Sequence, residues 1–277
     1  MKVDIILVPY DSGHARKRMG LGPERIFHSG LQEVLKRHAA GFESEEISLE
    51  SPYPAEISAA FELGRKVALA VRQSREGGRF PIVLSGNCNA AVGTVSGCGA
   101  HKTGIVWFDA HGEANTPETT VSGFLDGMPI ATLLGRAWRN LARTIPGFEP
   151  IAGDRIVLFG ARDVEPAERD LLNSSGVLQV GTVDKLKSHL PSLAKRVDGV
   201  YVHVDLDVLD PSVAVANQWA SPGGITLECL LEGVFEVRKK TRIVALGVAS
   251  YDPAGDRDNK ALNAALRLVD TVFGYRS

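Results

Sequence analysis

Several short segments of this chain are dominated by Val, Ile, Leu and aromatic residues, without the alternation of polar and apolar residues that marks a half-exposed strand. Unbroken apolar runs of this length are typical of parallel strands that are buried on both faces. They lie at residues 3–8, 81–84, 104–109, 155–160, 200–206 and 242–249, with weaker candidates at 43–47 and 177–180. A sheet of such strands must be covered by helices on both faces, so the pattern predicts an α/β fold.

Amphipathic helical patterns separate these runs. Residues 226–240 begin with Thr226 and carry acidic residues early and basic residues late, an order that suits the helix dipole. Further helices are expected at about 23–40, 54–76, 89–97, 128–137, 165–175, 184–196 and 258–273. The alternation predicts right-handed βαβ crossovers. Because no linker, repeat or low-complexity tract interrupts it, we expect a single domain over residues 1–277.

Composition excludes several classes of protein. Lys and Arg number 31 against 33 Asp and Glu, which leaves a formal charge of −2 and no basic footprint for nucleic acid or an anionic membrane. Three cysteines are too few and too widely spaced for a disulfide framework. No segment approaches the about 18 consecutive apolar residues of a membrane span, and the apolar run at the start is too short for a signal peptide. We therefore expect a cytoplasmic protein that acts on a small molecule and binds neither nucleic acid nor membrane.

Acidic clusters follow two of the predicted strands. Asp109, His111 and Glu113 come at the end of one, and Asp205 and Asp207 at the end of the other. Ligands of open parallel sheets bind beyond the carboxyl ends of the strands. In an extended segment, side chains two residues apart point to the same side, so each cluster is expected to converge on one point.

Four carboxylates gathered in this way would repel one another, and divalent cations would relieve that repulsion. Oxygen ligands with one imidazole favour a hard to borderline ion, and Mn²⁺ fits best. Since carboxylates can bridge, such a set can hold two ions about 3.5–4 Å apart. The sequence therefore predicts a binuclear site that activates a water for attack on a trigonal carbon.

Four segments resemble the motifs of arginases, agmatinases and related ureohydrolases, in the family's order and along most of the chain. They are SGNCNAAVGT (85–94), WFDAHGEANTPETTVSGFLDGMP (107–129), FGARDVEPAER (159–169) and VHVDLDVLDP (202–211), the last followed by GGIT (223–226). The resemblance implies a three-layer α/β/α sandwich around a mainly parallel sheet of about eight strands. It also implies two Mn²⁺ per chain, a metal-bridging hydroxide that attacks a guanidinium carbon, and homo-oligomers by family analogy.

The resemblance also assigns roles to single residues. Asp109 and Asp205 match the bridging carboxylates, His111 and Asp207 would complete one ion, and Glu113 and Cys88 would complete the other. Asn115 and Ser122 match positions that hold the α-amino acid end of the substrate, and Glu165 matches a residue that contacts its amino group.

Several positions depart from the family pattern. Cys88 replaces the usual His, and a thiolate suits Mn²⁺ poorly. This half of the site would therefore be weakly occupied or would hold Zn²⁺ or Fe²⁺, or Cys88 is an inert packing residue. A hydroxyarginine-hydrolysing branch of the family also has Cys there. Glu113 replaces an Asp, which lengthens the ligand by one methylene group. Asp126 stands where arginases have a proton-shuttle His, as a relay of its own or as a surface turn residue.

Other departures concern the substrate. Phe124 replaces an Asn that contacts the substrate carboxylate. Ser250 stands where the family has a Glu that grips the guanidinium, and Asp252 either substitutes for that Glu or is a loop residue before Pro253. His203, two residues before Asp205, is either a partner of the metal ligands or a satisfied core residue.

We therefore predict a metal-dependent amidinohydrolase that cleaves a C–N bond of a linear guanidino or amidino compound, arginine-like and possibly modified. Asp109, His111 and Asp126 are its expected catalytic residues. Two alternatives stay open. One is a deacetylase-like hydrolase of another linear amide, and the other is a near-inactive relative that binds metal without turnover.

Overall fold

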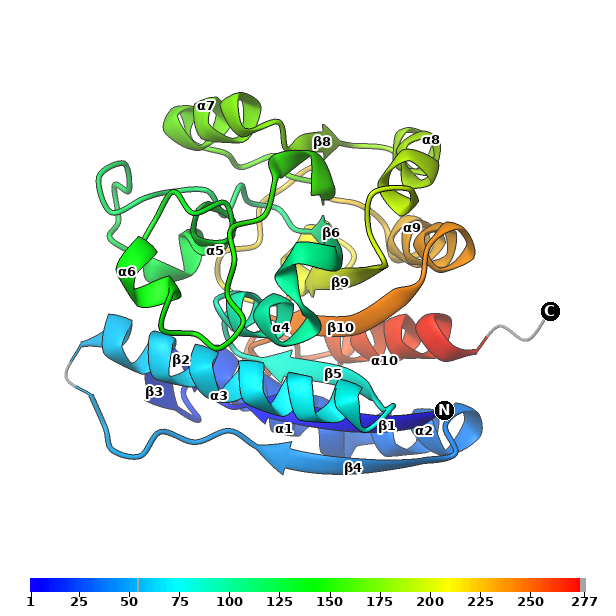
Figure 1. Cartoon of the computed structure of the whole chain (residues 1–277). Coiled ribbons are helices and arrows are strands. Elements are labelled where there is room, and N and C mark those ends of the chain that lie inside the picture. Colours follow the sequence, from blue (N-terminus) through cyan, green and yellow to red (C-terminus); the bar gives the residue numbers. More distant parts are fainter. Residues whose placement is uncertain (54, 275–277) are drawn as a thin grey trace.

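The computed structural model describes residues 1–53 and 55–274, which are built around an eight-stranded sheet (Figure 1). Its strand order is β4-β1-β5-β10-β9-β6-β7-β8, and neighbouring strands all run parallel. The strands are β1 (Lys2–Val8), β4 (Gly41–Glu46), β5 (Phe80–Ser85), β6 (Thr103–Phe108), β7 (Ile156–Phe159), β8 (Leu178–Val180), β9 (Gly199–Asp205) and β10 (Ile243–Ala249). All eight strands expected from the apolar runs are confirmed.

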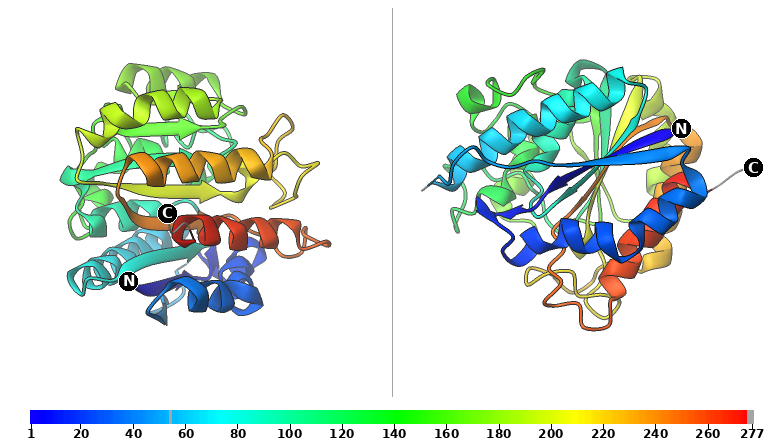
Figure 2. Two further views of the ribbon diagram at one scale, coloured as in Figure 1. Left: turned by 90° about the vertical axis from the view of Figure 1, so that its right-hand side faces the viewer. Right: turned by 90° about the horizontal axis from the view of Figure 1, so that it is seen from below.

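Helices cover both faces of this sheet, as Figure 2 shows from two further directions. One face carries α1 (Gly22–Ile26), η2 (Phe27–Leu31), α2 (Gln32–His38), α8 (Val183–Ala194), α9 (Leu227–Lys240) and α10 (Lys260–Phe273). The other carries α3 (Glu56–Glu76), α4 (Ala90–Cys98), α5 (Pro129–Leu133), α6 (Arg139–Ala142) and α7 (Pro166–Ser175). The predicted three-layer sandwich is therefore confirmed.

Two helices differ from their predicted extent. The helix expected over about 23–40 is interrupted at Ser29 and Gly30, because Gly30 has a φ of 135° and is packed against Leu266 of α10. The helix expected over about 128–137 ends at Leu133, since Gly135 takes the left-handed conformation with a φ of 69°. A short hairpin of β2 (Tyr10–Asp11) and β3 (His14–Ala15) was not expected at all.

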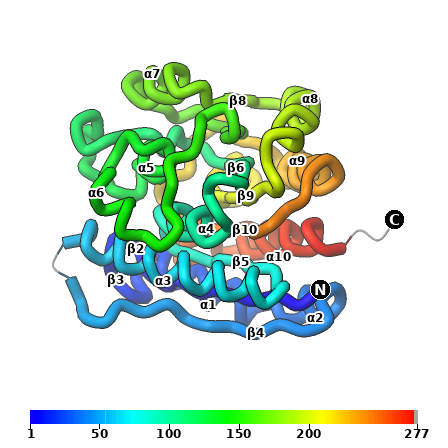
Figure 3. Tube along the Cα trace, in the orientation of Figure 1, coloured from blue at the N-terminus to red at the C-terminus, as the bar shows by residue number. Residues whose placement is uncertain are grey.

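The order of the strands in the sheet differs from their order in the chain, which creates a topological switch point near the middle of the sheet. Strands β5 and β6 follow one another in sequence, but the late strands β9 and β10 lie between them. Figure 3 shows the trace with β4 and β8 at opposite edges of the sheet. The carboxyl ends of β5, β10, β9 and β6 are therefore neighbours, at the kind of switch point where open sheets bind ligands.

No helix in the described ranges, 1–53 and 55–274, combines the length and the apolar character that crossing a bilayer requires.

The helical layers are held to the sheet by apolar burial, which a matched pair of leucines tests. Leu230 of α9 is fully buried, whereas Leu69 of α3 is 52% exposed. We expect Leu230→Ala to lower the free energy of unfolding by about 2–5 kcal/mol, because it leaves a cavity in the core. We expect Leu69→Ala to change it by less than about 0.5 kcal/mol. Urea unfolding measures both, and equal effects would contradict this account of the packing.

Candidate metal centre

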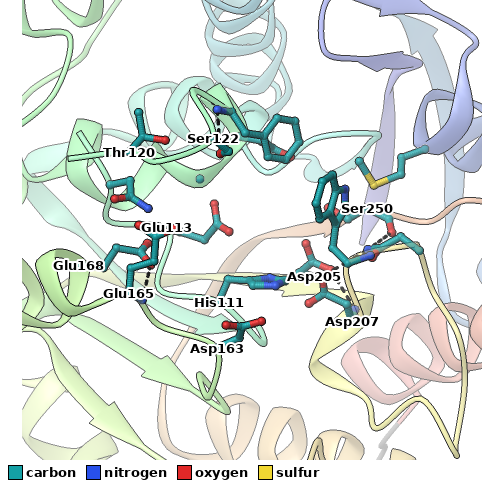
Figure 4. Close-up of a pocket in the computed structure, with 17 residues that line it drawn as sticks. His111, Glu113, Thr120, Ser122, Asp163, Glu165, Glu168, Asp205, Asp207 and Ser250 are labelled. Atoms are coloured by element: carbon teal, nitrogen blue, oxygen red, sulfur yellow. Dashed lines mark hydrogen bonds and ion pairs between the residues drawn. The ribbon is translucent and has the colours of Figure 1, made fainter. Parts of the chain in front are cut away.

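A cavity of about 260 Å³ opens at the carboxyl ends of the central strands (Figure 4). Seven of the described acidic residues line it: Glu113, Asp126, Asp163, Glu165, Glu168, Asp205 and Asp207. Among the described residues that line it there is one histidine, His111, and neither lysine nor arginine. The cavity is therefore a strongly negative site, suited to cations.

Asp109 lies directly after β6, in contact with the cavity-lining His111, and is fully buried. Its Oδ2 accepts a hydrogen bond from Trp107 Nε1 at 2.8 Å, and its Oδ1 accepts one from the His111 backbone N–H at 2.8 Å. Asp205 ends β9, accepts the Asp207 backbone N–H on Oδ1 at 2.9 Å, and accepts the Cys88 thiol on Oδ2 at 3.1 Å. These bonds fix both carboxylates before any cation binds.

Two groups of potential metal-donor atoms share Asp109. In the first, His111 Nδ1 lies 3.3 Å from Asp109 Oδ1 and 3.5 Å from Asp207 Oδ2. The second consists of Cys88, Asp109 and His203. Within each group the donor atoms lie within 4.8 Å of one another. Figure 4 shows the ring of His111 directed toward Asp205 and Asp207.

Glu113 supplies a further sign that the site is built for cations. It has a left-handed backbone with a φ of 53°, and its buried Oε2 has no hydrogen-bond partner among the described residues. Burial, together with repulsion from Asp109 and Asp126, raises the pKa of Glu113 well above its ordinary value. An unpartnered buried carboxylate oxygen aimed into an acidic cavity is costly by itself and would be satisfied by a divalent ion.

Burial and neighbouring negative charges also shift the pKa values of three other ligand candidates, Asp205, Asp207 and His111. Burial and the charges of Asp207 and Asp109 raise the pKa of Asp205 well above its ordinary value, and burial followed by Asp109 raises that of Asp207. For His111, burial acts downward, but the hydrogen bond to Asp109 and the charge of Asp207 raise the pKa to about 10. Each raised pKa favours the protonated form of its group, so protons offset part of the negative charge of the cluster. The donor set, oxygen-rich with imidazole and thiol, therefore fits two divalent cations.

The clusters converge by a different route from the one expected. The extended alternation predicted for them is wrong, because β6 ends at Phe108 and Glu113 turns into the left-handed region. Likewise, Leu206–Val208 form a single 3₁₀ turn, so the side chain of Asp205 caps the Asp207 N–H. Local turns, not strand pleating, bring these side chains together.

Four of the five residues predicted to bind substrate line the cavity: Asn115, Ser122, Glu165 and Ser250. Asp252 is not among the lining residues, and its Oδ1 accepts the Ala254 N–H at 2.9 Å, as expected of a loop residue.

Asp126 is buried and lines the cavity, so the interpretation of it as a surface turn residue is wrong. Its carboxylate accepts Asn87 Nδ2 at 2.8 Å and the Asn89 N–H at 2.9 Å. Burial outweighs these bonds and raises the pKa of Asp126 to about 7. A carboxyl group with this pKa exchanges a proton readily near neutral pH.

Several residues of the cavity lining carry no signal in the sequence that marks them as part of a site. Trp219 stacks on Phe124 with ring centroids 5.5 Å apart, and Asn217 Nδ2 donates to Asp207 Oδ2 at 3.3 Å and to the Ser250 carbonyl at 2.8 Å. Both lie in the irregular segment between β9 and α9, where no periodicity marks them. Asp163, also missed, lies within a motif that the sequence did single out.

Two charged side chains hold the loops of the cavity in place. Glu168 of α7 accepts the Ala114 N–H at 2.9 Å and the Glu165 N–H at 3.0 Å, so it ties the loop after β6 to the start of α7. Arg162 donates to backbone carbonyls on both sides of the segment after β9, including those of Asp207 at 2.9 Å and Ser221 at 2.7 Å.

The role of Glu168 predicts a stability effect. Glu168→Ala leaves two backbone N–H groups without their partner, so we expect the free energy of unfolding to fall by about 1–3 kcal/mol. Asp170→Ala, an exposed position on the same helix, is the matched control and should change it by less than about 0.5 kcal/mol. Urea unfolding compares them, and indistinguishable curves would show that Glu168 does not hold this loop.

Comparison with known proteins places these features in a family. The sequence matches the model of the arginase family over residues 1–274. It is 31% identical to the arginase of Brevibacillus brevis, with 98% of this chain and 97% of that protein covered. It is 30% identical to the arginase of Bacillus caldovelox, with 99% and 98% covered, and the solved structure of that enzyme matches this one with a TM-score of 0.89 over 99% of each chain. With a match along nearly the whole chain in sequence and in structure, the protein belongs to the arginase family.

Proposed function

We propose that this protein is a metal-dependent amidinohydrolase that cleaves a C–N bond of a guanidino or amidino compound. The observation that carries the proposal is the pair of donor groups that share Asp109, beside an acidic cavity that His111 and Asp207 line. The named relatives are arginases, which supports the same reaction class here.

Asp109 and Asp205 would bridge two divalent ions, with Mn²⁺ the expected metal. His111 and Asp207 would complete one position, and Glu113 and Cys88 would contribute to the other. When bound, the ions supply Lewis-acid chemistry and lower the pKa of a coordinated water. The chain itself orients these ligands, since Trp107 Nε1 and the His111 backbone N–H fix the Asp109 carboxylate.

The wall of the cavity favours a cationic substrate. Its acidic residues attract an amidinium or guanidinium group, and the described lining contains neither lysine nor arginine to compete. Asn115, Ser122 and Glu165 would hold an α-amino acid end, as their counterparts do in the family. Asp126, with a pKa raised by burial to about 7, would hand a proton to the departing amine.

Ser250 supports a modified substrate in preference to unmodified arginine. It is buried, it lines the cavity, and it occupies the position that the resemblance assigns to a guanidinium-gripping Glu. A hydroxyl cannot form the charge-assisted bidentate pair that a carboxylate forms with a guanidinium. A polar substituent on the guanidino group would instead find a hydrogen-bonding partner in Ser250.

A substrate screen tests this proposal. We expect the Mn²⁺-supplemented protein to release urea or a substituted urea from guanidino compounds, with a modified arginine preferred to arginine itself. Asp205→Asn should abolish the release, because it removes a bridging carboxylate. Glu118→Gln, an exposed position in the loop after β6, should leave it unchanged. Turnover of acylated amines alone would favour the deacetylase-like alternative, and metal binding without any turnover would favour the near-inactive one.

The metal centre also predicts a linkage between ions and stability. Each ion that binds only the folded state at 100 times its Kd should add about 2.7 kcal/mol to the free energy of unfolding. Asp109→Asn should lose most of this increment, because both donor groups share Asp109. Asp163→Asn, also at the cavity but in neither group, should keep it. Thermal melts with and without Mn²⁺ measure the increment, and a full increment in Asp109→Asn would place the ions elsewhere.

A further inference from the structure

We infer that His203 is a direct metal ligand, and that Cys88, Asp109 and His203 form a thiolate–imidazole–carboxylate set that prefers Zn²⁺, Co²⁺ or Fe²⁺ to Mn²⁺. This inference rests on the binuclear site proposed above and makes its two positions chemically unequal. His203 would supply the imidazole ligand of the metal position that contains Cys88. The ligands predicted from the sequence did not include this strand residue.

The sheet register places His203 where it can reach this position. In β9 it pairs with Trp107 of β6 on one side and with Gly247 of β10 on the other. Its ring stacks on Trp107 with centroids 3.8 Å apart. A Cβ at Gly247 would clash with Tyr201 Oη and lie 3.2 Å from His203 Nδ1, so only glycine leaves room for this pair. The imidazole of His203 is therefore held between Trp107 of β6 and Gly247 of β10.

Hydrogen bonds orient the ring for ligation. Tyr201 Oη lies 2.7 Å from His203 Nδ1, which leaves Nε2 facing the Cys88 Sγ at 3.2 Å. In the ion-bound state that we infer, Nδ1–H would donate to the tyrosine oxygen, and the lone pair of Nε2 would be directed at the donor group. Metal-binding histidines usually donate their other ring N–H to a fixed acceptor in this way, which sets the tautomer and the ring angle.

The surroundings of Cys88 favour a cation over a simple hydrogen bond. Its sulfur lies 3.1 Å from Asp205 Oδ2, 3.2 Å from His203 Nε2 and 3.6 Å from Ser250 Oγ. A thiol is a weak donor and a weak acceptor, so it satisfies a buried imidazole nitrogen poorly. The thiolate is a strong ligand, and sulfur with imidazole selects borderline ions, whereas Asp109, His111 and Asp207 form the harder set.

A cysteine beside a histidine is also the arrangement of a covalent nucleophile. That interpretation does not fit here, because Cys88 is 1% exposed and is not among the residues that line the cavity. His203 is equally buried. The pair lies behind Asp205 and Ser250, which do line the cavity, so a substrate in the cavity would meet these two residues before the sulfur.

Cobalt spectroscopy on the full chain tests the inference. The metal-free protein is titrated with Co²⁺ to two equivalents, and the wild type should show a near-ultraviolet thiolate-to-cobalt band. Proton NMR should show two paramagnetically shifted imidazole N–H signals, one from His111 and one from His203. Two bound ions with one imidazole signal, or without the thiolate band, would overturn the inference and leave the proposed function intact. Failure to bind cobalt at all would overturn both.

Variants assign the signals. His203→Gln should remove one imidazole signal and weaken the thiolate-bound ion by at least about tenfold. Cys88→Ser should remove the thiolate-to-cobalt band, and the ion bound by Asp109, His111 and Asp207 should remain. His111→Gln is the matched control, and it should remove the other imidazole signal while keeping the band. An unchanged band and affinity in His203→Gln would show that His203 only packs beside the site, and the wild-type spectra decide the question if that variant does not fold.

Discussion

Mutual repulsion among buried carboxylates is the constraint around which the centre of this protein is built. Asp109, Glu113, Asp205 and Asp207 lie in one poorly hydrated space, and each additional negative charge makes the others harder to ionise. The rest of the site limits that cost. Trp107 and backbone N–H groups spread part of the charge of Asp109 and Asp205, but Glu113 keeps an oxygen with no partner among the described residues. Cations are the remaining means of balancing the cluster.

The sheet makes this concentration of charge possible. Four neighbouring strands, β5, β10, β9 and β6, each deliver a polar residue at the carboxyl end, although the strands are far apart in sequence. The strands themselves are apolar and buried, so the rigid core lies directly beneath the charged residues. Left-handed backbones at Glu113 and Ser250 redirect the chain at the tips, as sparsely populated conformations often do at functional sites.

The sequence was sufficient to predict the layers, the strands and the two acidic clusters, because apolar runs and strand-end acids are local signals. It was insufficient for contacts that depend on distant residues. The approach of His203 to Cys88 spans 115 positions and requires the bare backbone of Gly247. Trp219 could not be placed at the cavity, since its segment has no periodicity. The interruption of the first predicted helix at Gly30 depends on packing against Leu266 of α10. The amphipathic pattern of neither helix reveals this contact.

Arg162 gives the rim and the floor of the cavity a common anchor. One guanidinium binds the carbonyl of Asp207, which lines the cavity, and those of Ser221 and Pro222, the rim segment that follows the cavity-lining Trp219. The rim therefore cannot swing outward as an independent flap without breaking bonds that also hold the backbone of Asp207. Arg162 would therefore transmit any displacement of residues 221 and 222 to the backbone of Asp207 in the acidic cluster.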